Sequence, residues 1–337
     1  MKPSEVIFTN QWPTEKKLGS SLLFIVDEVL KNQVPETLRE SKHVYWVKSG
    51  EDLKNIHQFP RHLENLVELC KGLDLSILKV VAIGGGSVGD FAGFFASVYR
   101  RGVGLIHIPS TWLAAMDSAH GGKTALNLGL AKNQIGSFYS AEKVILVKPL
   151  LLRQPLERLQ DALGEALKMA IIDKKVFARF SKLKTWSEKA AWSVLPEIVK
   201  AKDCVVQKDP FEKKGVRQNL NLGHTLGHIL EIQHGLSHGH SVLLGTLFAL
   251  EMSEAFGFLK ASSRRQIEKL PLWPDHHFAE LLKLMRRTAQ RESLLKLDKK
   301  STLNSQIRFV FIAGPGKTIV KSVPQQKLFQ FWDKMLS

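Results

Sequence analysis

Short apolar runs alternate with longer helix-like segments from about residue 20 to residue 150. The runs are LLFIV, HVYWV, KVVAI, GLIHI and KVILV. Each has the length of a buried strand, and a segment with helical spacing of apolar positions follows most of them. Strands that alternate with helices are typical of a parallel sheet covered by helices, so this half is predicted to be an α/β domain.

The pattern changes after Pro149 and Pro155. Segments lengthen and become helical until residues 306–312 and 318–323, two strand-like runs that flank a Gly-Pro-Gly turn. That arrangement predicts a late β-hairpin. We therefore expect two domains, an α/β domain over residues 1–155 and a mainly helical domain over residues 156–337.

Histidines occupy the polar side of a predicted helix over residues 220–231, LNLGHTLGHILE. At about 100° per residue one side holds Leu222, Leu226, Ile229 and Leu230, and the other holds Asn221, His224, His228 and Glu231. A second imidazole pair follows in SHGH, with His238 and His240. Two histidines one turn apart suit a metal or proton transfer, but they also occur on solvated helix faces.

A further helix is predicted over residues 156–172, with Glu165 and Lys168 opposite its apolar stripe. Periodicity alone predicts that this i, i+3 pair is a solvent-exposed ion pair. If another part of the protein covered it, Glu165 and two histidines could form an open three-ligand metal site.

A glycine-rich segment, GGGSVGD, follows the run KVVAI and precedes FAGFFASVY. A G-x-G-x-x-G pattern between a strand and a helix is typical of pyrophosphate binding, because glycines allow close approach and helix amides donate to the anion. It is also found in turns needed only for packing. Lys123, Lys132 and Asn133 lie among later glycines and suit phosphate oxygens, although each lysine alone is typical of a surface.

Composition limits the class of protein. The 337 residues are 44% hydrophobic and 24% charged, include two cysteines, and carry a net charge of +16. The basic residues are scattered without a DNA-reading motif, which favours an anionic small molecule over nucleic acid. No uncharged apolar stretch approaches a membrane span, and the spacing of the cysteines suggests no disulfide framework, so a cytoplasmic protein without membrane contact is expected.

Ordered motifs from Asp27 to Val323 resemble those of the 3-dehydroquinate synthases, a family of sugar phosphate cyclases. They are GEDLK (50–54), GGGSVGD (84–90), YRRG (99–102), MDSAHGGKT (116–124), AKNQIGSFY (131–139), GEALK (164–168), GVRQNLNLGHTLGH (215–228), SHGH (237–240) and LDKK (297–300). The resemblance implies a Rossmann-like NAD-binding domain, a helical metal- and substrate-binding domain, an active site between them, and a homodimer. It also implies a bound Zn²⁺ or Co²⁺.

Members of this family convert 3-deoxy-D-arabino-heptulosonate 7-phosphate, a phosphorylated sugar acid, into 3-dehydroquinate and phosphate on the shikimate route. NAD oxidises the substrate alcohol, phosphate is eliminated, the hydride returns, and ring opening and aldol closure follow. The resemblance assigns the metal ligands to Glu165, His224 and His238, which replaces a pairing of His224 with His228 on one metal. His228 then resembles the acid/base group, as a near-neutral pKa would suit.

The remaining roles also follow from the resemblance. The substrate phosphate and carboxylate are expected to contact Lys123, Asn133, Arg217, Asn221, one of Lys299 or Lys300, and Arg101 of the dimer partner. Other substrate contacts are expected from Asp117, Lys168 and Lys202. NAD is expected to contact Asp27, Glu51, Lys54, Gly84, Gly85, Gly86, Asp90, Ser110, Thr111 and Lys132.

Some positions depart from the family pattern. His240 stands where glutamate is usual, Ala131 replaces a glycine, and Val29 occupies a position that is usually polar. Three alternatives stay open: a cyclase for another sugar phosphate, a metal-dependent polyol dehydrogenase, and a basic nucleic-acid-binding protein. Arg217 and Asn221 favour the dehydroquinate enzymes, because they resemble that family's carboxylate and phosphate partners.

Overall fold

The computed structural model describes residues 2–129, 131–270, 276–289, 291 and 306–337. The chain forms two compact units, Met1–Arg158 (unit 1) and Leu159–Ser337 (unit 2). Within the described ranges, no helix combines the length and the apolar character needed to cross a membrane.

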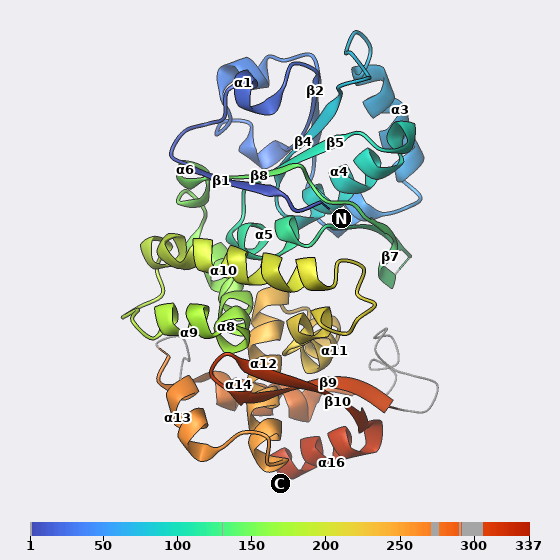
Figure 1. Ribbon diagram of the computed structural model, residues 1–337. Helices are drawn as coiled ribbons and strands as arrows, with labels where there is room; N and C mark the ends of the chain where they lie inside the picture. The colour runs from blue at the N-terminus through green and yellow to red at the C-terminus, as the bar shows by residue number, and fades with distance from the viewer. Residues whose placement is uncertain (1, 130, 271–275, 290, 292–305) are drawn as a thin grey trace. The chain divides into compact units, whose positions relative to one another are not determined.

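A parallel sheet of six strands forms the centre of the described part of unit 1 (Figure 1). Its order is β1 (Glu5–Thr9), β8 (Lys143–Val147), β5 (Gly104–Pro109), β4 (Lys79–Gly84), β2 (Leu22–Asp27) and β3 (Val44–Val47). All six residues of β2 are buried, as expected for a strand covered on both faces. The five strands predicted from apolar runs are therefore confirmed.

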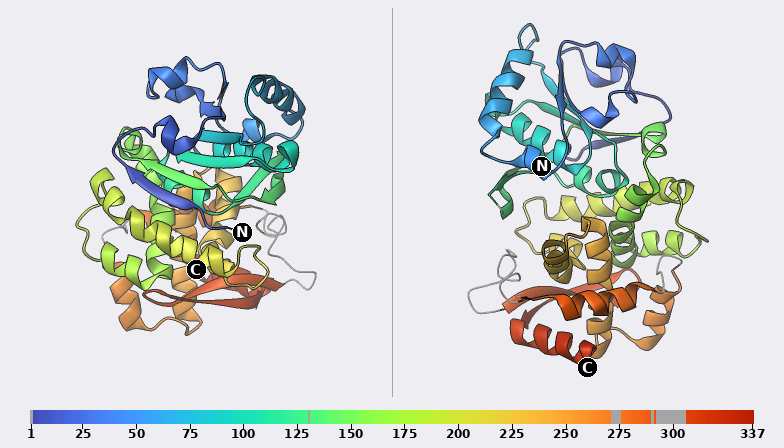
Figure 2. Two further views of the ribbon diagram at one scale, coloured as in Figure 1. Left: turned by 45° about the horizontal axis from the view of Figure 1, so that its top comes forward. Right: turned by 180° about the vertical axis from the view of Figure 1, so that it is seen from behind.

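Helices cover both faces of this sheet, and Figures 1 and 2 show α1 on one side with α3 and α4 on the other. Unit 1 contains α1 (Glu15–Leu18), η1 (Glu28–Leu30), α2 (Glu36–Arg39), η2 (Glu51–Lys54), α3 (Phe59–Leu69), α4 (Gly86–Val98), η3 (Tyr99–Arg101), α5 (Trp112–Met116), η4 (Ser118–His120) and α6 (Lys148–Leu151). On the α1 face, alternate strand residues such as Phe24, Val81 and Ile106 pack with Leu18 and Leu30 in one apolar cluster. Alternation in the strands thus divides the core between the two faces.

The strand order reverses between β2 and β4. Beyond β2 the chain adds β3 on one side, and after β4 it adds β5 and then β8 on the other. Ligands of open α/β sheets bind outside the carboxyl ends of the strands at such a point. The glycine segment that follows β4 lies at this edge, in the strand-to-helix context predicted from the sequence.

An antiparallel hairpin formed by β6 (Lys123–Leu128) and β7 (Ala131–Phe138) was missed by the sequence analysis. Seven of the eight residues of β7 are exposed, so no buried side imposes an apolar alternation on it. Strand β1 was also missed. Lys123 and Lys132, which were predicted to contact the substrate and NAD, therefore lie on a ribbon of two strands.

Unit 2 is mainly helical and contains a hairpin, as predicted. Its elements are α8 (Leu163–Ile172), α9 (Lys174–Phe180), α10 (Glu188–Lys208), η5 (Arg217–Asn221), α11 (His224–His234), α12 (His238–Ala255), α13 (Ala261–Glu268), α14 (His276–Arg287), β9 (Gln306–Gly314), β10 (Lys317–Pro324) and α16 (Gln325–Leu336), with α7 (Leu156–Asp161) at the junction. Helix α12 is central: it packs against α8, α11, α14 and β9, and Val242 to Leu250 are buried without a break. A helix that is apolar all round is a buried helix.

Two predicted helices are interrupted. The helix predicted over residues 156–172 forms as α7 and α8, with Ala162 between them. The helix predicted over residues 220–231 begins only at His224, because Gly223 has a left-handed φ of 78° and Asn221 belongs to the preceding 3-10 turn. The polar face of α11 is nevertheless as predicted, since His224, His228 and Glu231 are half-buried while Leu226 and Ile229 are buried.

His107 makes the stability of unit 1 sensitive to acid. Burial within β5 lowers the pKa of this imidazole from 6.5 to about 4. Because the folded state binds the proton less well than the unfolded state, stability falls as the pH drops from 6.5 toward 4. The free energy of unfolding of unit 1, measured with denaturant, should fall by about 3 kcal/mol over this pH range through His107 alone.

The variant His107→Gln should remove that part of the pH dependence, measured as the difference in unfolding free energy between pH 7 and pH 4. The exposed His57 offers the control, and His57→Gln should keep the wild-type profile. An unchanged profile in His107→Gln would refute the assignment.

Candidate metal and cofactor sites

Three side chains from three helices of unit 2 converge on one point. Glu165 comes from α8, His224 from the first residue of α11, and His238 from the first residue of α12. Their candidate ligand atoms all lie within 4.8 Å of one another. Both imidazole Nε2 atoms approach the same oxygen of Glu165, at 3.5 Å from His224 and 3.4 Å from His238.

These distances fit a tetrahedral metal site. Two ligand atoms each about 2.05 Å from a tetrahedral zinc ion are about 3.3 Å apart. The Nδ1 atoms of both rings lie beside other oxygens, 3.1 Å from the carbonyl oxygen of Leu222 for His224 and 3.1 Å from Glu231 for His238. When each Nδ1 donates its proton there, each Nε2 presents a lone pair, which is the tautomer that binds a metal.

The charge on Glu165 requires compensation because the residue is only 1% exposed. One oxygen pairs with the ammonium of Lys168, which is also buried, and the other faces the two imidazoles. Burial disfavours a charged His238, but Glu165 and Glu231 outweigh it and raise the pKa of His238 to about 10. A positive charge, as a proton or a metal ion, is therefore favoured between these groups.

This geometry corrects the periodicity argument for Glu165 and Lys168. Both were expected on an exposed face, and both are buried at 2% exposure or less. Elements α9, α10, α12 and η5 of the same unit pack around α8, so its polar side is covered as well as its apolar side.

Glycines bring the ligand-bearing helices unusually close together. A Cβ on Gly239 would lie 1.4 Å from the carbonyl oxygen of Asp161, and a Cβ on Gly164 would lie 1.9 Å from the carbonyl oxygen of Gly239. A Cβ on Gly245 would lie 1.9 Å from the carbonyl oxygen of Gly223. Each of the three ligands is thus next to a glycine at which two backbones are in contact.

Glu231 is a supporting residue that the sequence analysis did not assign. Its carboxylate lies 3.1 Å from Nδ1 of His238 and can fix the orientation of that ring. It also groups with His228 and His238 within 4.8 Å. The sequence signal was available, because Glu231 shares the polar face of α11 with His224 and His228, but its contact with His238 depends on the tertiary fold.

His228, the predicted acid/base residue, lies beside the cluster. Its ring centroid is 5.4 Å from that of His224 and 6.4 Å from that of His238. Lys202 on α10 and Arg217 on η5 are both buried, at 4% exposure each. Since η5 packs against α8 and α10, the predicted substrate residues Lys168, Lys202, Arg217 and Asn221 lie on neighbouring elements.

Asp209 organises the turn that leads to η5 and was also missed. Its carboxylate accepts backbone hydrogen bonds from Lys213, Lys214 and Arg217 at 2.8, 3.0 and 3.2 Å. The Arg217 guanidinium in turn donates to the carbonyl oxygen of Pro210 at 3.2 Å. These bonds hold a buried arginine in place, which suits a partner for an anion.

Unit 1 collects most of the predicted cofactor residues at the carboxyl edge of its sheet. Asp27 ends β2, Gly84 ends β4, and Ser110 and Thr111 follow β5. Asp27 accepts a hydrogen bond from the amide of Val29 at 3.3 Å, and Thr111 accepts one from the amide of Ala114 at 3.2 Å. These side chains therefore shape the edge at the point where the strand order reverses.

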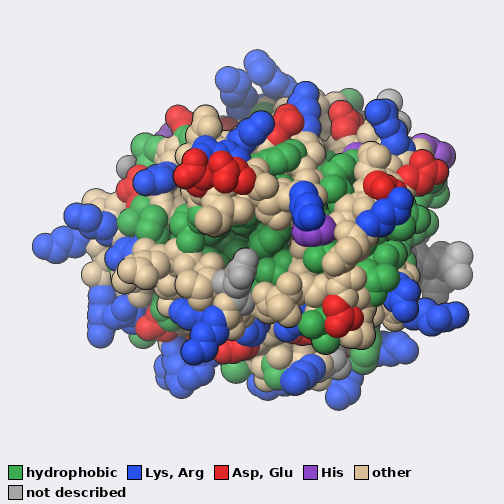
Figure 3. All heavy atoms as spheres, turned by 90° about the horizontal axis from the view of Figure 1, so that it is seen from above, with side chains coloured by type: hydrophobic (Ala, Val, Ile, Leu, Met, Phe, Trp, Pro, Cys, Tyr) green, Lys and Arg blue, Asp and Glu red, His purple; other side chains and the backbone are tan. Residues whose placement is uncertain are grey.

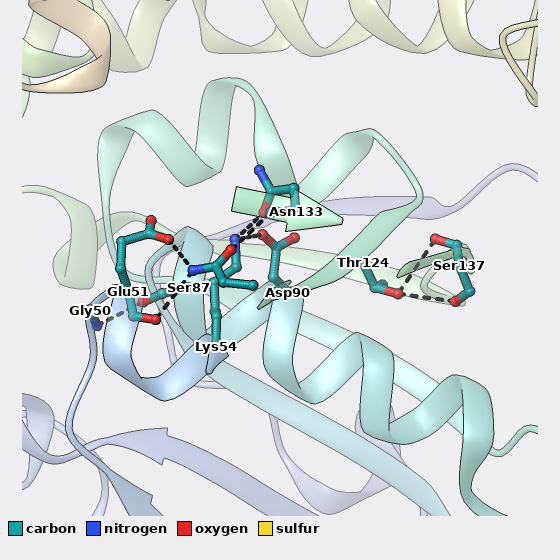
Figure 4. Close-up of polar contacts among 9 residues, drawn as sticks. Gly50, Glu51, Lys54, Ser87, Asp90, Thr124, Asn133 and Ser137 are labelled. Atoms are coloured by element: carbon teal, nitrogen blue, oxygen red, sulfur yellow. Dashed lines mark hydrogen bonds and ion pairs between the residues drawn. The ribbon is translucent and has the colours of Figure 1, made fainter. Parts of the chain in front are cut away.

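A polar network joins η2, α4 and the β6–β7 ribbon (Figure 4). The ammonium of Lys54 lies 2.6 Å from Asp90 and also donates to the side-chain oxygen of Asn133. Asn127 links the same ribbon to Glu51 at 2.7 Å and accepts from the amide of Asn133 at 2.8 Å. Burial raises the pKa of the Asp90 carboxyl, and the Lys54 ammonium opposes that shift.

One pocket of unit 1 is lined by Gly84, Gly85, Gly86, Asp90 and Lys123, together with His107 and others. A Cβ on Gly84 would lie 2.6 Å from the Cβ of Val88, so the turn into α4 leaves no room for a side chain. The amino end of α4, with Gly85 as its N-cap, offers backbone amides at this pocket.

The structure also describes three further residues that were predicted to contact NAD or substrate. Lys132 is exposed on β7, Asp117 is half-buried at the end of α5, and Arg101 is exposed with a left-handed φ of 66°. Lys299 and Lys300 lie outside the described residues. Figure 3 shows Lys and Arg side chains spread over one face rather than gathered into a stripe, as their scatter along the sequence suggested.

Fold and site together define a class of enzymes that combine a dinucleotide-type parallel sheet with a helical unit carrying a group of metal-ligating side chains. Comparison with known families makes this specific. Residues 44–161 match the family model described as 3-dehydroquinate synthase N-terminal, and residues 162–301 match the model described as 3-dehydroquinate synthase C-terminal. The chain belongs to the 3-dehydroquinate synthase family, as its motifs predicted.

Individual relatives agree with this assignment. A 3-dehydroquinate synthase of Pyrobaculum aerophilum is 32% identical over 324 residues, 94% of this chain and 90% of that protein. One of Alkaliphilus metalliredigens is 37% identical over 232 residues, 66% of this chain and 64% of that protein.

Among solved structures, 2-epi-5-epi-valiolone synthase of Streptomyces hygroscopicus subsp. jinggangensis, with NAD⁺ and Zn²⁺ bound, superposes with a TM-score of 0.76. The two sequences are 19% identical, and the superposition covers 99% of this chain and 97% of that chain. This likeness supports the fold class, a Rossmann-like α/β unit with a mainly helical second unit.

The contact at Gly239 provides a test of the helix packing. Gly239→Ala should lower the unfolding free energy of unit 2 by about 3 kcal/mol, because the added methyl group meets backbone rather than a movable side chain. It should also weaken metal binding by moving His238. Gly235, whose Cβ position is open, is the control: Gly235→Asn should cost about 1 kcal/mol or less. Equal costs in the two variants would contradict the packing argument.

The role of Glu231 can be tested by metal retention. Glu231→Gln should weaken binding of zinc by about 10- to 100-fold, as expected for loss of a carboxylate behind a histidine ligand. Competition with a chromophoric chelator measures this affinity. Glu251, a glutamate on α12 that pairs with Arg264, is the control, and Glu251→Gln should leave zinc affinity unchanged. Wild-type affinity in Glu231→Gln would rule out a positioning role.

Proposed function

We propose that the protein converts 3-deoxy-D-arabino-heptulosonate 7-phosphate into 3-dehydroquinate and inorganic phosphate, as a carbon–oxygen lyase. Membership of the 3-dehydroquinate synthase family supports this reaction. The structural observation that supports this reaction most strongly is the convergence of Glu165, His224 and His238 beside the buried Lys168.

Glu165, His224 and His238 would hold a divalent cation, Zn²⁺ or Co²⁺, with Glu231 orienting one imidazole. Two nitrogens and one oxygen form a donor set that suits such ions, and three protein ligands leave a position for an oxygen of the substrate. When bound, the cation supplies Lewis acidity at the substrate oxygen and NAD supplies a reversible hydride acceptor.

His228 would transfer protons beside this centre. Its ring is next to those of both histidine ligands, so a substrate oxygen bound at this centre would lie near it. Lys168, paired with Glu165, would fix the direction of the carboxylate and contribute positive charge toward substrate hydroxyls.

Buried cations of unit 2 would recognise the anionic ends of the substrate. Arg217 is held by the turn around Asp209, and a guanidinium forms paired hydrogen bonds to a carboxylate or phosphate. Asn221 and Lys202 would complete this pocket. Lys123 and Asn133 of the β6–β7 ribbon, Asp117, one of Lys299 or Lys300, and Arg101 of a dimer partner are proposed as the remaining contacts.

NAD would bind at the carboxyl edge of the sheet in unit 1. Gly84, Gly85 and Gly86 would admit the pyrophosphate to the amino end of α4, and the ends of β2 and β5 flank that position. Its other proposed contacts are Asp27, Glu51, Lys54, Asp90, Ser110, Thr111 and Lys132. We also propose a homodimer and a cytoplasmic location.

A cyclase for another sugar phosphate is the second candidate, because such an enzyme shares this fold. Arg217 and Asn221 favour the dehydroquinate reaction, because they resemble that family's partners for the carboxylate and phosphate of the heptulosonate. The phosphate ester of an uncharged sugar has no carboxylate.

Phosphate release tests both candidates. Purified protein with NAD⁺ and Zn²⁺ should release inorganic phosphate from the heptulosonate phosphate without accumulation of NADH, and a chelator should stop it. Absence of phosphate release from this substrate by protein that binds NAD⁺ would refute the proposal. Turnover of other sugar phosphates instead would indicate the second candidate, and net NADH formation would indicate a dehydrogenase.

His228→Asn should slow phosphate release by about 10²- to 10⁴-fold while zinc content stays at the wild-type level. His234 lies on the same helix, near Thr288 rather than the metal ligands, so His234→Asn is the matched control and should react at close to the wild-type rate. If His228→Asn keeps full activity, His228 is not the acid/base group.

A further inference from the structure

A second group of metal-ligating side chains lies in unit 2. His240 on α12 and His277 and Glu280 on α14 offer ligand atoms that all lie within 4.8 Å of one another. His277 and Glu280 are three residues apart on their helix, so they share a face. His240 is two residues beyond His238, and residues at that spacing project from different sides of a helix. His238 and His240 therefore belong to separate groups.

The contacts within this group are close. Nε2 of His240 lies 2.9 Å from a carboxylate oxygen of Glu280. The ring centroids of His240 and His277 are 5.3 Å apart. Ligand atoms around a tetrahedral ion are about 3.3 Å apart, so Glu280 needs to move by a few tenths of an ångström to admit one. Its side chain is 32% exposed and has room for that movement.

His277 is the part of this group that a simple ion pair does not explain. The residue is 7% exposed, and its Nδ1 is buried without a hydrogen-bond partner among the described atoms. A buried polar atom left unpaired costs about 1–3 kcal/mol.

We propose that His240, His277 and Glu280 form a second site for a divalent transition-metal ion, separate from the cluster of Glu165, His224 and His238. Two imidazoles and one carboxylate favour zinc, cobalt or nickel over magnesium or calcium. Because α12 and α14 each supply ligands, a bound ion joins the first turn of α12 to α14 and stabilises the helix that also carries His238.

Metal content provides the test. Purified full-length protein, stripped with a chelator and reloaded with Zn²⁺, should bind two ions per chain by elemental analysis. Glu280→Gln should bind one, since the amide can still accept a hydrogen bond from His240 but ligates zinc poorly. His276, the exposed neighbour of His277, is the control, and His276→Ala should still bind two.

Variants at each site separate this proposal from the proposed function. His224→Ala should remove one ion, and His224→Ala combined with Glu280→Gln should remove both. One ion per chain in wild type that survives Glu280→Gln and is lost in His224→Ala would overturn the second site alone. A single ion lost only in Glu280→Gln would instead refute the first site. Circular dichroism confirms that each variant is folded.

Discussion

The grouping of Glu165, His224 and His238 depends on direct contact between the backbones of the helices that carry them. Gly164 and Gly239 allow α8 and α12 to meet at a carbonyl oxygen, and Gly223 and Gly245 do the same for α11 and α12. Side chains normally keep packed helix axes about 8–10 Å apart. The glycines beside the three ligands have no side chains, so these helices approach closely and the three side chains reach one point. The geometry of the site is therefore set by packing before any ion binds.

The same packing buries the carboxylate of Glu165, whose negative charge must be compensated. A carboxylate at 1% exposure is costly to bury unless it is paired, and Glu165 meets one ammonium and two imidazoles. Both Nε2 atoms face the same oxygen of Glu165, and the Nδ1 atoms of both rings lie beside other oxygens, so this point favours a positive charge, either a proton or a metal ion. A metal ion bound there would therefore stabilise unit 2, which would link folding and metal binding.

Periodicity and motifs predicted different parts of this protein. Apolar runs located five strands and the late hairpin, because buried strands and glycine turns leave local signals. Periodicity placed Glu165 and Lys168 in solvent, because it separates the faces of a helix but does not show that a second helix covers the polar one. It also continued a helix through Gly223, where the backbone turns left-handed. The three metal ligands were assigned through resemblance to a family. Roles for Glu231 and Asp209 depend on contacts across the tertiary fold, which no local pattern contains.

The strand order of the sheet, and not the place of the segment along the chain, puts the glycine segment of unit 1 at the edge where ligands bind. In an ordinary dinucleotide fold this segment follows the first strand, whereas here it follows β4. Strand β4 nevertheless lies beside the point where the strand order reverses, between β2 and β5. The amino end of the helix after such a strand points outward at the crevice, so its amides can meet an anion there. Two strands added earlier in the chain, β1 and β3, occupy the edges of the sheet and leave this central position unchanged.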